Sequence, residues 1–302
     1  MGVLHLPPGL PPGLPPGLPH GLSSAGRHGT WPAEPARMVA LDVDGTLLGH
    51  DGIVAPQVLA AIGRAVAAGL HVGLATGRMA LGVTELLATT RLPGPHVLHN
   101  GAEVRMGDEV LVSWPVPRDA LQAALDGCAD AGIYLEVYVS DGFHVNTMDE
   151  RARAHWDLLG HQPLSEIRHA DDVDGPVAKV TAAVFEGGDV QRVVDVLTQA
   201  GLLAGAAGSP ATPTLTYVNG THPDADKGTA FRAAAELLGI PIEATVAVGD
   251  AANDLPLLAV AGTAIAMGQA APEIIAAAHL VAPGVDSYGA AVALDAAAAG
   301  WR

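Results

Sequence analysis

Two carboxylates follow an apolar run near the start of the chain, in the segment MVALDVDGTLL at residues 38–48. The apolar run is typical of a buried strand, and Gly45 supplies the turn after it. Asp42 and Asp44 are two residues apart, so in a regular strand their side chains share one face. A buried carboxylate is unfavourable without a partner, and Thr46 adds a hydroxyl at the same place. This spacing indicates a polar site at the end of a strand.

Two other interpretations of this segment are a strand that ends in an ordinary polar loop and a calcium loop. Short motifs often occur by chance, so the first stays open at this point. An EF-hand loop needs glycine at its sixth position and glutamate at its twelfth. Counted from Asp42, glycine is fourth and the twelfth residue is Ile53, so the calcium interpretation fails.

Polar residues also end later apolar segments. The segment 70–75 runs into TGR at 76–78, and the segment 245–248 runs into GDAAND at 249–254. Strands that alternate with helices form a parallel sheet, and ligands bind at the carboxyl edge of such a sheet. The residues that we expect to converge at this edge are Asp42, Asp44, Thr76, Lys227, Asp250, Asn253 and Asp254.

Three carboxylates at one edge repel one another and repel a phosphate group. Two unit charges 4 Å apart interact with about 4 kcal/mol at an effective dielectric constant of 20. A divalent cation relieves this repulsion, and oxygen donors without cysteine or paired histidine favour Mg²⁺. A carboxylate can then attack phosphorus to form an aspartyl-phosphate, while a second carboxylate transfers protons.

The composition limits the kind of partner. The chain has 302 residues, 49% of them hydrophobic, and a formal net charge of −17, which argues against nucleic acid or an anionic membrane as a partner. No apolar run reaches the length of a membrane span. The single cysteine, Cys128, suits a reducing compartment, so we expect a cytoplasmic protein. The two lysines are Lys179 and Lys227, and we expect Lys179 at the solvated surface.

Composition and pattern divide the chain into three parts. Residues 1–36 carry a PPGL repeat that cannot form a packed core, and we predict a disordered tail there. Residues 37–101 and 223–302 carry the strands that alternate with helices. Residues 102–222 mix strands and helices in a way that predicts an inserted α+β domain. The predicted elements of this insertion are a hairpin at 133–145, a strand at 178–185 and helices near 119–131 and 189–200.

Four motifs in this order resemble those of the haloacid dehalogenase-like (HAD) hydrolase superfamily, over about residues 38–295. They are DVDGT at 42–46, TGR at 76–78, DKG at 226–228 and GDAAND at 249–254. Two further segments, NGA at 100–102 and MGQA at 267–270, are similar to signatures of its Cof-type (type IIB) branch, which usually has Asn where this chain has Gln269. The resemblance implies an α/β fold with a Rossmann-like parallel sheet core. It also implies an inserted α+β (type 2) cap domain that selects the substrate.

The resemblance also implies a role for each motif residue. Asp42 would be the nucleophile and a Mg²⁺ ligand, and Asp44 the general acid/base with its backbone carbonyl on Mg²⁺. Thr76 and the amide of Gly77 would bind the phosphoryl oxygens, and Lys227 would bridge nucleophile and phosphate. The other implied site residues are Asp250 as the further metal ligand, Thr46 as a phosphate contact, and Asn253, Asp254 and Arg78 in support.

The expected function is a Mg²⁺-dependent phosphatase of small phosphomonoesters, such as sugar phosphates. A phosphomutase or phosphotransferase would use the same aspartyl-phosphate. A receiver-like signalling module combines similar residues but has no large inserted cap, and a non-catalytic phosphate-binding protein would not need all four motifs. The expected partner is a small phosphorylated metabolite, with no nucleic acid and no membrane, and the oligomeric state stays open.

Overall fold

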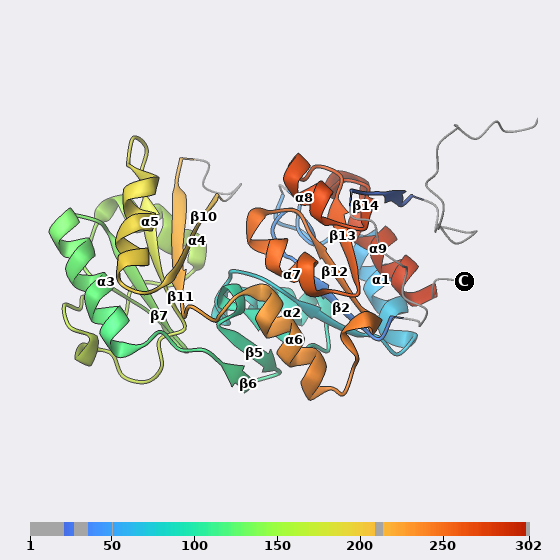
Figure 1. Ribbon diagram of the computed structural model, residues 1–302, viewed down its shortest axis with the longest axis horizontal. Helices are drawn as coiled ribbons and strands as arrows, with labels where there is room; N and C mark the ends of the chain where they lie inside the picture. Colours follow the sequence, from blue (N-terminus) through green and yellow to red (C-terminus); the bar gives the residue numbers. More distant parts are fainter. Residues whose placement is uncertain (1–20, 27–35, 50, 209–213, 300–302) are drawn as a thin grey trace, which may run out of the picture.

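A computed structural model describes residues 21–26, 36–49, 51–208 and 214–299. Figure 1 shows the elements in two lobes, each built on its own sheet. None of the helices in these ranges has the length and apolar character needed to cross a membrane.

The larger lobe contains a six-stranded sheet in the order β1-β14-β13-β12-β2-β3. All neighbouring pairs are parallel except β1 and β14. The strands of this sheet are β1 (Ser23–Ser24), β2 (Met38–Leu41), β3 (His71–Leu74), β12 (Thr245–Gly249), β13 (Thr263–Met267) and β14 (Leu280–Ala282). The helices around it are α1 (Pro56–Ala67), α2 (Thr84–Thr90), α6 (Lys227–Leu237), α7 (Leu255–Val260), α8 (Pro272–Ala277) and α9 (Gly289–Ala299), with 3-10 turns η1 (Leu81–Val83), η5 (Ile242–Ala244), η6 (Ala252–Asp254) and η7 (Val285–Ser287).

Strand β2 is apolar on both of its faces because helices cover both sides of the sheet. Its residues Val39 and Leu41 pack in the cluster that contains α1 and α9. Its residues Met38 and Ala40 pack in the cluster that contains α6 and α7. A strand buried on both sides reads as a continuous apolar run, which is the pattern that the sequence showed at this place.

The smaller lobe contains a five-stranded antiparallel sheet in the order β10-β11-β9-β7-β8. The predicted hairpin, strand and helices of the insertion are all present. The elements are α3 (Arg118–Ala131), β7 (Leu135–Val139), β8 (Gly142–Val145), η3 (Glu150–Ala152), α4 (Arg153–Leu159), η4 (Ala170–Asp172), β9 (Lys179–Val184), α5 (Val190–Gln199), β10 (Leu203–Gly208) and β11 (Thr216–Thr221). One sheet face, with Val137 and Val180, packs in an apolar cluster with α3 and α5.

The structure moves the predicted start of the insertion, residue 102, further along the chain. Strands β4 (His96–Leu98), β5 (Glu103–Met106) and β6 (Glu109–Ser113) form a separate three-stranded sheet, and the 3-10 turn η2 (His99–Gly101) connects β4 to β5. Val104 of β5 is buried in the same cluster as Phe231 of α6, so this hairpin packs on the larger lobe. The short strands looked like those of the insertion because strand pattern alone does not say which core a strand joins.

The prediction of a disordered tail over residues 1–36 is wrong for part of that range. Ser23 and Ser24 form β1, which pairs with Val281 and Leu280 of β14. Leu22 is buried in the core cluster of the larger lobe. Strand β14 would otherwise be an edge strand, and an edge strand offers unpaired backbone groups to a passing segment. The PPGL repeat itself lies outside the described residues.

Candidate active site

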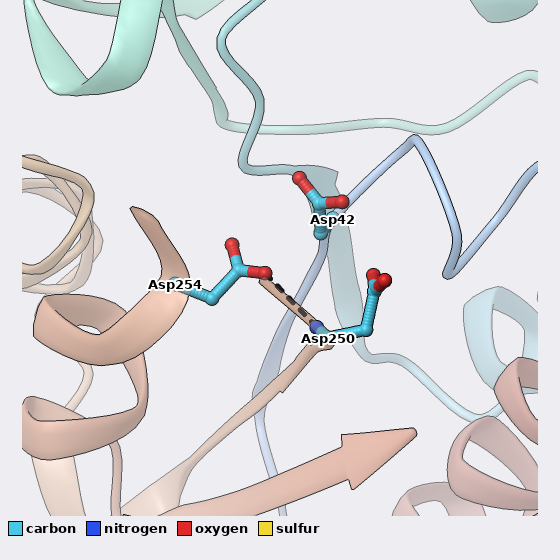
Figure 2. Close-up of side chains that lie close together, drawn as sticks. All are labelled: Asp42, Asp250 and Asp254. Atoms are coloured by element: carbon cyan, nitrogen blue, oxygen red, sulfur yellow. Dashed lines mark hydrogen bonds between the residues drawn. The ribbon is translucent and has the colours of Figure 1, made fainter. Parts of the chain in front are cut away.

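The carboxyl ends of the neighbouring strands β2 and β12 bring the first and the last of the four motifs together. Asp42 follows β2 and Asp250 follows β12, and the amide of Asp42 donates to the carbonyl of Val248 across the two strands, at 2.9 Å. Figure 2 shows Asp42, Asp250 and Asp254 around one point at this edge of the sheet. The predicted convergence of these residues is therefore present.

Lys227 lies between two of these carboxylates. Its Nζ donates to Oδ1 of Asp42 at 2.7 Å and to Oδ1 of Asp254 at 2.6 Å, and the lysine is 1% exposed. The side chain of Asp226 caps the start of α6 by accepting from the amide of Thr229, which fixes where the helix begins and hence where Lys227 stands. Burial opposes the charge of Lys227, but Asp254 and Asp42 outweigh it and raise its pKa.

The side chain of Asp254 accepts hydrogen bonds from three partners. Besides the bond from Lys227, its Oδ2 accepts from the amides of Asp250 and Ala251, at 3.0 Å each, and the first of these bonds is drawn in Figure 2. Both oxygens of Asp254 are thus engaged within the protein, as suits a supporting residue. Asp250 in contrast accepts from Thr46 Oγ1 at 2.8 Å.

The Thr46 hydroxyl donates its proton to Asp250 in this structure. The contact of Thr46 with phosphate, which the family resemblance implies, stays a prediction. Gly45 beside it has φ +87°, and a Cβ at this position would lie 2.3 Å from Asp250 Oδ2. Only glycine therefore allows the loop after Asp42 and the loop after β12 to approach this closely.

The electrostatics of the cluster fit a bound cation. One oxygen from each of Asp42, Asp250 and Asp254 lies within 4.8 Å of the others, and among the described residues this is the one group of three or more potential metal ligands. Burial, and then the charge of Asp254, raise the pKa of Asp42 well above its usual range, although Lys227 opposes this. Burial likewise raises the pKa of Asp250 to about 6. One lysine is not enough to offset three carboxylates, and oxygen donors of this kind suit a hard divalent cation.

Asp44 stands apart from this cluster. Its carboxylate forms a two-point ion pair with Arg78, with bonds of 2.7 and 3.0 Å, and both side chains are partly exposed. Its carboxylate is not part of the cluster of Asp42, Asp250 and Asp254, and the group predicted to bind the metal is its backbone carbonyl. An exposed carboxylate near the buried ones can exchange protons with solvent, which is compatible with its predicted part in proton transfer.

The loop at residues 76–78 lies on the other side of Asp42. Thr76 is buried, and its Oγ1 accepts from the amide of Arg78 at 3.1 Å. Asn100, with φ +59°, approaches Gly77 so closely that a Cβ on Gly77 would lie 2.7 Å from its Oδ1. The same Oδ1 accepts from Asn253 at 3.2 Å, which joins this loop to η6.

A sequence profile described as haloacid dehalogenase-like hydrolase matches residues 39–294 of this chain. The chain belongs to this family. The matched range contains both lobes and all the strand-end loops described above, so the haloacid dehalogenase-like hydrolase fold accounts for the whole site.

Known relatives align with most of this chain. It is 26% identical over 286 residues to 5-amino-6-(5-phospho-D-ribitylamino)uracil phosphatase YwtE of Bacillus subtilis, covering 86% of this chain and 97% of the relative. It is 27% identical over 244 residues to HMP-PP phosphatase of Cronobacter sakazakii, covering 80% and 87%. Among solved structures, the subclass IIB sugar phosphatase BT4131 matches with a TM-score of 0.71 at 23% identity, covering 84% of this chain and 96% of that one. A haloacid dehalogenase-like hydrolase from Bacteroides thetaiotaomicron matches with a TM-score of 0.74 at 20% identity, covering 86% and 98%. The structural likeness shows the shared fold.

Two residues of this hydrolase lie at the site without having been predicted there. Lys179, which we expected at the surface, is 7% exposed, and its Nζ donates to the carbonyl of Gly77 at 3.0 Å. Gln269 donates to the carbonyl of Gly45 at 2.6 Å and accepts from the amide of Val285 at 3.0 Å. The scarcity of lysine was a signal for the first, and the departure from Asn was a signal for the second.

Proposed function

We propose that this hydrolase is a metal-dependent phosphatase of small phosphomonoesters that forms an aspartyl-phosphate (an acyl phosphate) on Asp42. The observation that carries the proposal is the buried lysine that joins Asp42 to Asp254, beside a second strand-end carboxylate, Asp250. This arrangement offers a nucleophile, a fixed positive charge and an oxygen-rich cation site within one cluster. The two curated relatives described above are named as phosphatases, which supports the same reaction class.

The carboxylates of Asp42 and Asp250 and the backbone carbonyl of Asp44 are the groups that would hold the cation. We assign Mg²⁺ to it because the donors are all oxygens and the family substrate brings phosphate oxygens of its own. When bound, the cation neutralises part of the charge on the phosphoryl group and on the cluster. Thr46 orients Asp250 through its hydrogen bond, and Asp254 orients Lys227.

The first chemical step uses Asp42 as nucleophile. Its free carboxylate oxygen forms a bond to phosphorus while the bond from phosphorus to the ester oxygen breaks. Protonated Asp44 gives its proton to the leaving oxygen, and the alcohol is released. Lys227 stays charged beside Asp42 and stabilises the negative charge that develops on the phosphoryl oxygens.

The second step releases phosphate. Asp44, now ionised, takes a proton from water, and the water oxygen attacks phosphorus. The bond from phosphorus to Asp42 breaks, which returns the carboxylate and yields inorganic phosphate. The Thr76 hydroxyl and the Gly77 amide hold phosphoryl oxygens in both steps, as the family resemblance implies. Transfer to a second alcohol in place of water would make the protein a phosphotransferase or a phosphomutase.

The smaller lobe is the part that we propose selects the substrate, which would be a small phosphorylated metabolite in the cytoplasm. The motif residues all come from the larger lobe, whereas the smaller lobe approaches them through β10 beside η6. Exchanging residues 117–221 for the corresponding segment of a relative is expected to change substrate preference and to leave the cation requirement unchanged.

The proposed function is tested by phosphate release. The purified protein, stripped with a chelator, is given a panel of sugar phosphates, nucleotides and cofactor phosphates with and without Mg²⁺. Release of inorganic phosphate that needs Mg²⁺ and is lost in D42N is the expected result. An isomeric phosphoester without free phosphate would establish a mutase, and no turnover of any compound would refute the proposal.

A further inference from the structure

The second lysine of the chain is buried where the two lobes meet. Lys179 begins β9 of the smaller lobe, and its ammonium group reaches across to the larger lobe. It donates to the carbonyl of Gly77 at 3.0 Å and to Oδ1 of Asn219 at 3.1 Å. Its third side is covered by the ring of Tyr138, with Nζ 4.6 Å from the ring centroid.

Packing alone does not account for a lysine at this position. The nearest partners of the ammonium are a carbonyl, an amide oxygen and an aromatic ring, and none of these carries a full charge. A buried ammonium without a carboxylate in hydrogen-bond reach is unfavourable, and an apolar side chain of similar volume would fill the space at lower free energy. Two of its three N–H groups donate within the protein and the ring of Tyr138 lies over the ammonium, so Lys179 is engaged mainly by the protein itself.

The contact with Gly77 fixes one particular peptide group. The peptide that joins Gly77 to Arg78 has its oxygen on Lys179 and its N–H on Thr76 Oγ1. A peptide group is planar, so holding its oxygen also sets the direction of its N–H. Because Thr76 Oγ1 accepts this N–H, the hydroxyl proton of Thr76 is left to point elsewhere, and a phosphoryl oxygen is the acceptor that the site would offer.

The same loop is attached to the smaller lobe by an apolar contact. Met79, which follows the loop, is buried in a cluster with Tyr138 and Phe143 of the smaller lobe. Lys179 and Met79 therefore attach residues 77–79 to one sheet face of that lobe, where Tyr138 lies over the Lys179 ammonium and belongs to the same cluster as Met79. The polar tie exists only while the two lobes are packed together as they are in this structure.

We propose that Lys179 is a positioning residue by which the smaller lobe, when packed on the larger one, orients the peptide 77–78 and through it the phosphate-binding hydroxyl of Thr76. The proposal rests on the proposed function for its catalytic consequence. The smaller lobe then helps to shape the phosphate-binding site, in addition to contacting the leaving group of the substrate. The consequence for kinetics is that loss of Lys179 affects every phosphomonoester to a similar degree.

The kinetic test compares K179M with the wild type on p-nitrophenyl phosphate and on the best sugar phosphate of the panel. We expect kcat to fall by about tenfold on both compounds, the scale of one lost hydrogen bond, with KM changed by less than about twofold. If KM rises for the sugar phosphate alone and kcat is unchanged, Lys179 is a contact to the leaving group and the proposal is wrong.

A second readout does not depend on turnover. Hydrogen–deuterium exchange of the segment 74–82 is expected to be about fivefold faster or more in K179M, because the Arg78 amide loses its fixed orientation, while the segment 228–237 in α6 is unchanged. T181V is the matched control, since Thr181 also donates to Asn219 Oδ1, at 3.0 Å, but makes no contact with the larger lobe through that bond. If K179M does not fold, K179Q, whose side chain is one bond shorter, takes its place with the same expectation.

The two readouts separate the two proposals. Faster exchange of 74–82 in a protein that releases no phosphate would refute the proposed function and support the positioning role. Phosphate release with unchanged exchange and unchanged kcat in K179M would overturn the positioning role and leave the function standing. An equal effect of T181V would show a general loss of stability in the smaller lobe and would also overturn it.

Discussion

The cluster of Asp42, Asp250 and Asp254 in the larger lobe and the buried Glu136 of the smaller lobe both place carboxylates away from solvent, but the partners of these carboxylates differ. At the cluster, Asp42, Asp250 and Asp254 share the single cation Lys227, so negative charge is in excess. In the smaller lobe, the fully buried carboxylate of Glu136 accepts from the hydroxyls of two tyrosines and contacts one histidine. These partners are Tyr134 at 2.8 Å, Tyr138 at 2.6 Å and His155 at 3.2 Å.

The difference indicates that the first region binds ligands and that the second stabilises the fold of the smaller lobe. A cluster that lacks positive charge is completed by a cation and an anionic substrate. Both oxygens of Glu136 are engaged by side chains of the protein, so this carboxylate needs no ligand. Helix α4 is attached to the sheet by His155 and by the bond from Trp156 to Tyr134. We therefore expect changes in the first region to act on turnover, and changes in the second to act on stability.

Lys227→Met is expected to give the largest effect, because it removes the only cation of the cluster. Turnover should fall by about 10²–10³, the scale of one lost electrostatic stabiliser in an active site. The free energy of unfolding should fall by about 3–5 kcal/mol in the metal-free protein, since two buried carboxylates lose their partner. Steady-state kinetics and denaturant unfolding measure the two effects. A change in turnover below about threefold would remove Lys227 from the chemistry.

Glu136→Gln is expected to change stability and to leave the chemistry largely intact. One carboxylate oxygen becomes an NH₂ group that faces hydroxyl or imidazole donors, so the unfolding free energy should fall by about 1–3 kcal/mol. Turnover of p-nitrophenyl phosphate should stay within about threefold of the wild type. The matched control is E186Q at an exposed site, which should alter stability by less than about 0.5 kcal/mol. A loss of turnover without a loss of stability in E136Q would reverse the comparison.

The charge of Lys179 links the two regions and is expected to vary with pH. Burial lowers the pKa of Lys179 to about 8, with Glu136 opposing the shift. The ammonium is therefore charged at pH 7 and loses its proton as the pH rises toward 9, which weakens its bond to Gly77. Burial raises the pKa of Tyr138 and lowers that of His99 to about 3, so neither changes charge in this range; Arg105 is the further cation that acts on His99.

From pH 7 to pH 9, the ratio of the wild-type kcat to the K179M kcat should therefore shrink severalfold. The reason is that a hydrogen bond from a charged ammonium is roughly twice as strong as one from a neutral amine. A ratio is measured because it cancels titrations that both proteins share. A ratio that stays constant over this range would show that the charge of Lys179 has no effect on the phosphate site.

Deletion of residues 1–26 is expected to give the smallest effect. It removes β1 from the edge of the larger sheet and exposes the pocket of Leu22, which should lower the unfolding free energy by about 1–2 kcal/mol. Turnover should not change, because β1 lies on the opposite edge of the sheet from β3. Thermal unfolding measures the loss, and L22A in the full chain should reproduce most of it. No change in melting temperature would mean that β1 does not contribute.

The position of Asp42 and Asp250 was predictable because each follows an apolar strand. In a parallel sheet all such ends lie at one edge, so Asp42 and Asp250 could be placed together without a structure. The contact of Lys179 with Gly77 could not be predicted, because the two residues are 102 positions apart and come from different lobes. Its place depends on the register that sets Tyr138 opposite Lys179 in the smaller sheet, which local pattern does not fix.

Other features of the molecule lie beyond what a sequence pattern can contain. The hydroxyl of Thr46 donates to Asp250 at 2.8 Å, and residue spacing does not reveal this bond. The start of the insertion was misplaced because Val104 looks the same in either core and only the position of α6 decides between them. The short strand β1 was hidden by the Pro/Gly composition of the segment around it.

The measurement that tests the account most directly is a rapid acid quench of the wild-type protein during turnover of a substrate that it demonstrably hydrolyses. The quenched protein is digested, and the peptide that contains Asp42 is analysed by mass spectrometry for a bound phosphate, with D42N treated in parallel. We expect phosphate on Asp42 in the wild type, none in D42N, and a loss of turnover in D42N of about 10⁴-fold or more. Unmodified Asp42 in the wild type together with retained activity in D42N would contradict the account.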